Sequence, residues 1–168
     1  MVISIISLLS SVILGSMNQA RVKAKNATRN QMVIQERNAL ELYRSSNNAY
    51  PNTYSASPNY YYCLGIHPND VCGTYQIDSS IYYGIWSNLL NNAIATYLSG
   101  AAPISTSPVP LFGAPEGNTP FLGALYRCNN ASCSNPTVSW ALEGTNQRCA
   151  QGAAASNLGS ATFCVLSL

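Results

Sequence analysis

The hydrophobic pattern of the chain changes sharply between residues 17 and 20. Residues 1–17 are apolar apart from small hydroxyl side chains, and they contain neither charge nor proline. Residues 20–48 are polar and free of glycine and proline, and their apolar positions approach the i, i+3, i+4, i+7 spacing of one helix face. Those positions are Met32, Val33, Ala39, Leu40 and Tyr43, with Glu36 interrupting the stripe. The pattern predicts one long helix over 1–48 that ends before Tyr50-Pro51, because a residue preceding proline disfavours the α region.

The following part of the chain is expected to hold shorter elements. Residues 49–86 form a Tyr-rich connection. A second helix is predicted over Ser87–Ser99, with Ser87 as its N-cap and Gly100 as its stop. The segment 101–120 is rich in Pro, Ser and Ala and is expected to be extended. The apolar face of the second helix comprises Trp86, Leu90, Ile94 and Tyr97.

Short apolar runs between turn residues predict three strands, at 122–128, 137–143 and 161–166. Residues 144–160 are expected to form a Gly-, Ala-, Ser- and Asn-rich loop. A helix followed by strands is the order of an α+β protein. We therefore expect an α+β fold in which a long N-terminal helix packs on a small antiparallel sheet. The expected divisions are the apolar half of the helix at 1–19, its amphipathic half at 20–48 and a globular head at 49–168.

The cysteines indicate an oxidising compartment. The chain has six Cys, all after residue 60, and only one His. An even number of cysteines favours disulfides. The spacing favours three local pairs, each contributing about 2–4 kcal/mol, although other connectivities remain open. A zinc site is the weaker alternative, because no C-x-x-C is present. The expected pairs are Cys63 with Cys72, Cys128 with Cys133, and Cys149 with Cys164.

The low charge and the many Tyr residues limit the classes of function that we expect for the chain. Charged residues make up 8 % of the chain, against roughly 25 % in ordinary domains, and the formal charge is +2. That charge is too weak to argue for nucleic acid. Eleven Tyr in a chain with few charged residues are typical of exported proteins that pack against copies of themselves, since Tyr is enriched at subunit contacts. Seven of the Tyr residues are expected to pack the head and to form subunit contacts, and binding of an external ligand is the alternative; they are Tyr50, Tyr54, Tyr60, Tyr61, Tyr62, Tyr82 and Tyr83.

No pattern of catalytic residues is present, and we expect no enzymatic activity and no cofactor. The acids are scattered, and neither a Gly-x-Ser-x-Gly nor a phosphate-binding Gly loop occurs. Calcium is a remote alternative, because the loop acids Asp70, Asp78 and Glu116 do not cluster in the sequence. His67 is expected to be a surface residue without a chemical role. Two N-glycosylation patterns occur, at Asn26-Ala-Thr28 and Asn130-Ala-Ser132.

The apolar run also suits a membrane anchor. Spanning a bilayer takes about 20 residues, and Met1–Met17 would be a helix of roughly 26 Å. The basic flank after it would place the head in the cytoplasm by the positive-inside rule. The six cysteines indicate instead that the head lies outside the cytoplasm, in an oxidising compartment, and we expect that orientation. The flanking cations are Arg21, Lys23, Lys25 and Arg29.

Two stretches within the first 51 residues match a known sequence pattern. The apolar run 1–17 passes into the Ala-Arg region around residue 21. Ala39-Leu-Glu-Leu-Tyr43 is followed by Asn47-Asn-Ala-Tyr-Pro51. This combination resembles the type IV pilins and type II secretion pseudopilins. Two later segments, Cys63-Leu-Gly65 and Ser139-Trp-Ala-Leu-Glu-Gly144, resemble parts of some bacterial pilin heads more loosely.

The chain departs from the family at its start. The family's mature chain begins Phe-Thr-Leu-Ile-Glu-Leu after a glycine where prepilin peptidase cuts, and neither is present here. We expect either that a leader and a few mature residues have been removed or that the start codon lies upstream. About seven more residues would bring the apolar run past the spanning length.

The resemblance implies a structural subunit of a type IV pilus-like filament. Its partners would be copies of itself in a helical homopolymer, the inner membrane before assembly and the pilus assembly machinery. It would supply adhesion, motility or DNA uptake from the cell surface, with its head outside the cytoplasm. The alternatives are a type II secretion pseudopilin and a membrane-anchored binding ectodomain that does not polymerise. The residues expected in the filament core are Ile3, Ile5, Ile6, Leu8, Leu9, Val12, Ile13, Leu14 and Gly15.

Overall fold

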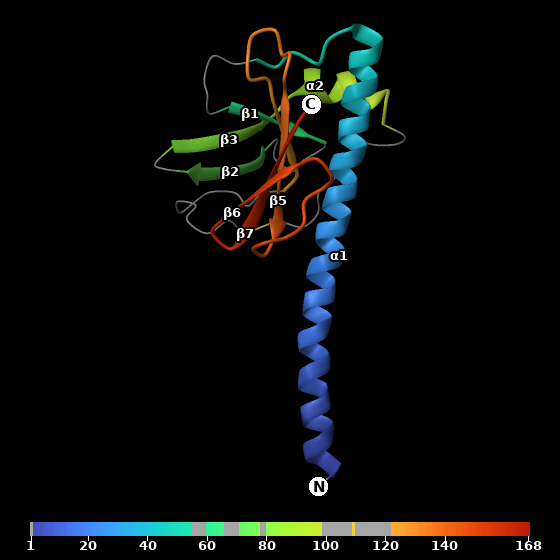
Figure 1. The fold of residues 1–168 in the computed structure, drawn as a ribbon, viewed down its shortest axis with the longest axis vertical. Helices are drawn as coiled ribbons and strands as arrows, with labels where there is room; N and C mark the ends of the chain where they lie inside the picture. The colour runs from blue at the N-terminus through green and yellow to red at the C-terminus, as the bar shows by residue number, and fades with distance from the viewer. Residues whose placement is uncertain (1, 55–59, 66–70, 78–79, 99–108, 110–121) are drawn as a thin grey trace.

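A computed structural model shows a long helix that carries a small α+β head at one end (Figure 1). The structure describes residues 2–54, 60–65, 71–77, 80–98, 109 and 122–168. Within the helices and strands, only the backbone is described for residues 2–16, 71, 74–77, 80–83 and 86.

Helix α1 (Val2–Asn47) contains 46 residues, so it is about 69 Å long. Its C-terminal half packs against the head, and its N-terminal half projects beyond it (Figure 1). The helix ends where Asn48 adopts a φ of 56°, a left-handed conformation that asparagine tolerates and that cannot continue the helix. Tyr50 then folds back on the C-terminal part of α1, where its hydroxyl donates to Glu41 Oε1 at 3.0 Å.

The head is built on a seven-stranded mixed sheet of order β2-β3-β1-β4-β5-β7-β6. The β1–β3 pair is parallel and every other neighbouring pair is antiparallel. The strands are β1 (Tyr60–Leu64), β2 (Val71–Ile77), β3 (Ser80–Trp86), β4 (Ala124–Arg127), β5 (Thr137–Glu143), β6 (Ala154–Leu158) and β7 (Ala161–Ser167).

The main core lies between α1 and one face of this sheet. Val33, Ala39 and Leu40 of α1 are buried in the same cluster as Tyr126 and Trp140 of the sheet. Side chains alternate between the faces of a strand, and β5 follows this rule. The β5 residues facing the α1 side are Val138, Trp140 and Leu142, whereas Ala141 joins a smaller cluster with Leu125 and Phe163.

Helix α2 (Asn88–Ala95) begins as the sequence predicts, with the Ser87 side chain accepting a hydrogen bond from the Leu90 amide. The helix is shorter than the predicted Ser87–Ser99. Buried Asn91 joins it to β1, because its side-chain nitrogen donates to Cys63 O at 3.1 Å and its oxygen accepts from Gly65 N at 2.9 Å.

Other sequence predictions need correction. The sheet is larger than expected and is not purely antiparallel, since β1 and β3 pair in parallel. The expected connection 49–86 contains three strands, whose Tyr- and Cys-rich runs lack a clear alternation. The expected loop 144–160 contains β6, which pairs with β7 across a two-residue connection in which Gly159 has a φ of 59°. Strand β5 has the predicted bounds.

Three disulfides join the cysteine pairs that the spacing predicts, Cys63–Cys72, Cys128–Cys133 and Cys149–Cys164. The first joins β1 to β2. The third joins the segment after β5 to β7. Each therefore closes a short segment onto the sheet, where it stabilises a head of modest size.

Within the described residues, no helix combines the length and apolar character that crossing a bilayer requires. The expected division at 1–19 stays a prediction.

Candidate assembly surface at the junction of helix and head

The projecting half of α1 is the first component of the candidate site. Met17 is 47 % exposed, and the residues from Asn18 to Arg21 are also exposed. The first buried residue of the described helix is Asn26. The helix therefore separates from the head near Asn26, and the backbone from Val2 onward continues as a projecting helix (Figure 1).

Asn26 fixes the place where the helix meets the sheet. Its side-chain nitrogen donates to Glu143 O at 2.9 Å, and its side-chain oxygen accepts from Glu143 N at 2.9 Å. The Asn26 side-chain amide thus bonds both the C=O and the N–H of Glu143, the last residue of β5, as a backbone peptide group of a neighbouring strand would. Asn26 is 5 % exposed, so both bonds are largely shielded from water.

Asn30, one turn further along α1, makes a second attachment. Its side-chain oxygen accepts from the indole nitrogen of Trp140 at 2.9 Å, and its side-chain nitrogen donates to Arg148 O at 2.9 Å. Trp140 is among the largest fully buried side chains. Two asparagines spaced i, i+4 therefore anchor α1 to β5 and to the segment that follows it.

Arg29 supports the first asparagine. Its guanidinium donates to Asn26 Oδ1 at 2.9 Å, and the residue is buried. Burial lowers the pKa of Arg29 from its ordinary value, and the nearby Glu143 carboxylate opposes that change. The guanidinium thus lies within the junction of helix and head, where its hydrogen bond to Asn26 stabilises the orientation in which Asn26 binds β5.

Glu36 occupies the buried face of α1. It is 3 % exposed, and within the described part of the chain its Oε2 has no hydrogen-bond partner. Burial raises the pKa of Glu36 from 4.5 to about 8. The carboxyl is therefore predominantly protonated at neutral pH, and the residue that interrupts the apolar stripe in the sequence lies in the core as a neutral acid.

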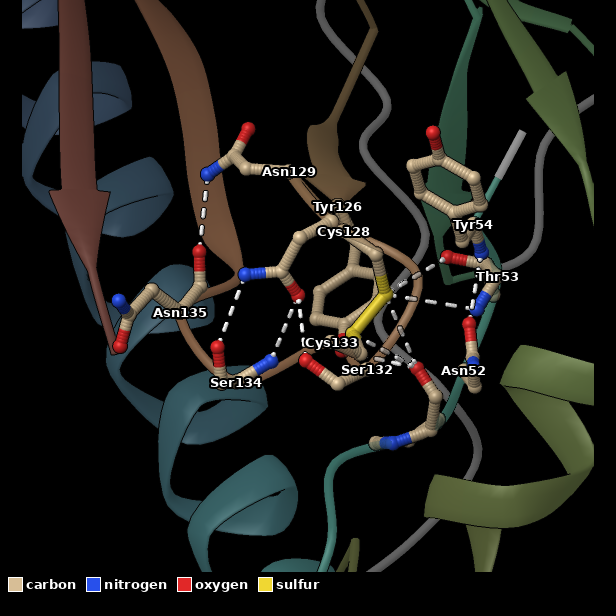
Figure 2. Close-up of a disulfide and its surroundings, with 12 residues drawn as sticks. Asn52, Thr53, Tyr54, Tyr126, Cys128, Asn129, Ser132, Cys133, Ser134 and Asn135 are labelled. Carbon is tan, nitrogen blue, oxygen red and sulfur yellow. Dashed lines mark hydrogen bonds between the residues drawn. A yellow bond between two sulfur atoms is a disulfide. The ribbon is translucent and has the colours of Figure 1, made fainter. Parts of the chain in front are cut away.

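The Cys128–Cys133 loop rests against the chain that follows α1 (Figure 2). Tyr126 donates its hydroxyl hydrogen to Pro51 O at 2.9 Å, and burial raises the pKa of this phenol. The Thr53 amide donates to Cys128 Sγ at 3.4 Å. The loop therefore holds residues 51–53 against β4.

The side chains of both glycosylation-pattern asparagines form hydrogen bonds, Asn26 at a buried position and Asn130 on an exposed loop. The Asn130 side chain accepts from Ser134 N at 3.1 Å and donates to Ser134 Oγ at 2.8 Å, so it organises the disulfide loop. Asn26 is bonded to Glu143. Both hydrogens of the Asn26 side-chain nitrogen are therefore used, on Glu143 O and on Gln147 Oε1, whereas Asn130 uses one.

The structure describes only some of the residues that the sequence analysis selected. Tyr54 and Tyr60 are exposed, as subunit contacts require, and Arg127 donates to the half-buried Tyr61 hydroxyl at 3.1 Å. Tyr50 is buried and Tyr62 is half-buried. The side chains outside the described part are Tyr82, Tyr83 and the nine proposed core residues Ile3, Ile5, Ile6, Leu8, Leu9, Val12, Ile13, Leu14 and Gly15.

The candidate calcium acids Asp70, Asp78 and Glu116, together with His67, also lie outside the described residues. Inside them, no group of three or more His, Cys, Asp and Glu is placed to hold a metal ion.

The chain matches no protein-family model, no curated protein and no solved structure.

Proposed function

We propose that this chain is a structural subunit of a helical filament of the type IV pilus kind. The observation that carries the proposal is the single helix α1, whose N-terminal half projects from a disulfide-linked head (Figure 1). The projecting segment, described from Val2, lies in the part of the sequence where residues 1–17 carry no charged side chain. Three disulfides support a head that works outside the cytoplasm, at the cell surface.

Hydrophobic chemistry supports assembly through this segment. Burying a Leu or Ile side chain contributes about 1.5–3 kcal/mol relative to exposing it. The run 1–17 contains seven Ile and Leu residues, which are Ile3, Ile5, Ile6, Leu8, Leu9, Ile13 and Leu14, and Val12 is a further branched apolar residue. Equivalent helices from other copies would cover this surface. Gly15 and the neighbouring serines would allow close helix approach.

The junction with the head supports a propagating assembly. Asn26 and Asn30 attach α1 rigidly to β5, so contacts made by the projecting helix would set the orientation of the head. A contact between the helix of one copy and a different surface of the next is heterologous and does not close. Exposed Tyr54 and Tyr60 would supply further contacts between heads.

A charge in the run tests the proposal. Leu9→Lys should abolish fibres in electron micrographs of cells producing the full chain, because burying an unpaired ammonium among apolar helices costs several kcal/mol. Gln19→Lys is the matched control, because Gln19 is an exposed position on the same helix. Wild-type fibre yield from Leu9→Lys would contradict the proposal. A type II secretion pseudopilin would respond in the same way but would form short periplasmic assemblies.

The main alternative is a binding ectodomain that does not polymerise. It predicts single particles with the same head and no fibres from the unmodified chain. Electron microscopy of the unmodified protein therefore separates the two functions before any variant is made.

A further inference from the structure

A shallow groove of about 290 Å³ lies beside the point where α1 leaves the head. One wall is α1, with Lys23, Ala27 and Asn30, and the other is the segment after β5, with Gln147 and Arg148. Asn26 and Cys149 complete the described lining. The groove is thus built by two segments that are far apart in the sequence and are held together by the asparagine contacts.

The charge of this groove is positive. Lys23 and Arg148 are exposed at its rim, and its described lining includes no acid. Neither Lys23 nor Arg148 forms an ion pair with an acid in the part of the chain that the structure describes.

The amides of the groove retain hydrogen-bonding capacity. A primary amide nitrogen carries two hydrogens. Asn30 uses one of them on Arg148 O, and Gln147 uses one on Thr145 O at 3.0 Å. Each therefore keeps one N–H, whereas Asn26 uses both of its hydrogens, on Glu143 O and on Gln147 Oε1.

From this arrangement we infer that the groove is a binding site for a phosphate group. Two cations and two spare amide N–H groups suit an anion with several acceptor oxygens, and Arg and Lys are the side chains that proteins use for phosphate. The group could come from free phosphate or from the headgroup of an anionic lipid, which share this chemistry. The inference does not depend on filament formation, because every lining residue belongs to one copy.

The experiment titrates the full chain, ¹⁵N-labelled and held in a zwitterionic detergent, with inorganic phosphate while side-chain amide signals are followed by NMR. Sodium chloride at equal ionic strength is the reference. The expected result is a saturable shift of the Asn30 and Gln147 amide signals. Chloride should reproduce none of it. Shifts that do not saturate, or that chloride reproduces, would overturn the inference.

Variants of the lining residues test whether phosphate binds in the groove. Lys23→Gln combined with Arg148→Gln should weaken phosphate binding at least tenfold. Lys25→Gln should leave binding within twofold, because Lys25 is exposed on the same helix but does not line the groove. All three side chains are exposed, so folding should be unaffected. If Lys25→Gln weakened phosphate binding as much as the double variant does, the inference would be contradicted. Phosphate would then be attracted by the general positive charge of the helix and not by the groove.

A second ligand identifies the source. Glycerophosphoglycerol, the deacylated headgroup of phosphatidylglycerol, is titrated in the same way. Tighter binding of this diester would support a lipid headgroup as the occupant, and tighter binding of inorganic phosphate would support the free anion. Absence of saturable binding for both would overturn the site.

Discussion

Asn26 of α1 and Glu143 of β5 exchange two hydrogen bonds of 2.9 Å, although 117 positions separate them in the sequence. The side-chain amide of Asn26 satisfies the backbone N–H and C=O of the last residue of β5. This pair marks the boundary between the head-bound and projecting parts of α1, and the proposed assembly depends on that boundary being rigid.

Asn26→Ala should therefore destabilise the head by about 2–3 kcal/mol, because it removes two shielded hydrogen bonds and leaves the backbone of Glu143 without its partner. Urea unfolding followed by tryptophan fluorescence measures the change. Asn38→Ala is the control, since Asn38 is exposed on the same helix, and it should stay within about 0.5 kcal/mol. Equal stability of the two variants would show that the pair contributes nothing.

Glu36 should make stability depend on pH. Its folded pKa of about 8 lies above the ordinary value of 4.5, so between these values the folded state binds a proton that the unfolded state has lost. Stability should then fall as pH rises from about 5 to 8, with a slope approaching about 1.4 kcal/mol per pH unit.

Glu36→Gln should remove most of this slope and raise stability at pH 8, because the glutamine amide stays neutral as the pH rises, whereas the Glu36 carboxyl deprotonates. Thermal unfolding at pH 5, 6, 7 and 8 gives the comparison. Glu41→Gln is the control, as the side chain of Glu41 is 39 % exposed, and it should keep the slope. A slope unchanged in Glu36→Gln would assign the pH dependence to other groups.

Gly84 packs against the first disulfide. A Cβ at this position would come within 2.7 Å of Cys72 Sγ and of Leu125 Cδ2. Gly84→Ala should cost about 1–3 kcal/mol through overpacking. The double variant Gly84→Ala with Leu125→Ala should cost less than the sum of the single variants, because removing the Leu125 side chain makes room. If the losses in free energy of unfolding of the two single variants simply added in the double variant, Gly84→Ala would not act through a clash with Leu125.

The Cys149–Cys164 bridge should contribute more than the Cys128–Cys133 bridge. Their sequence separations are 15 and 5, and the chain-entropy model gives about 3 kcal/mol for the longer loop and less for the shorter. Paired Cys→Ser variants, compared by urea unfolding, measure the difference. The reverse order would show that local packing outweighs loop entropy.

The sequence predicted the elements with strong local signals. The long helix, the Ser87 cap, β5 and the three cysteine pairs each depend on nearby residues. Strands β1, β2, β3 and β6 were missed because pairing across the sheet, rather than alternation within each strand, defines them. The parallel pairing of β1 with β3 also has no local signal.

The site was only partly predictable for the same reason. The apolar run of the projecting helix is visible in the sequence, whereas Asn26 and Asn30 look like ordinary polar residues on a solvated face. Their i, i+4 spacing was the available signal, but their partners Glu143 and Trp140 come from a strand more than a hundred positions away. Only the folded chain shows that the asparagines join helix to head.

Assembly through the projecting helix is best tested by cryo-electron microscopy of fibres sheared from cells that produce this chain, followed by helical reconstruction. We expect fibres whose central density fits the N-terminal half of α1 from many copies, with the disulfide-linked heads on the outside. Cells that produce the folded chain but no fibres containing it, or fibres with that helix half facing solvent, would show that the chain does not assemble in this way.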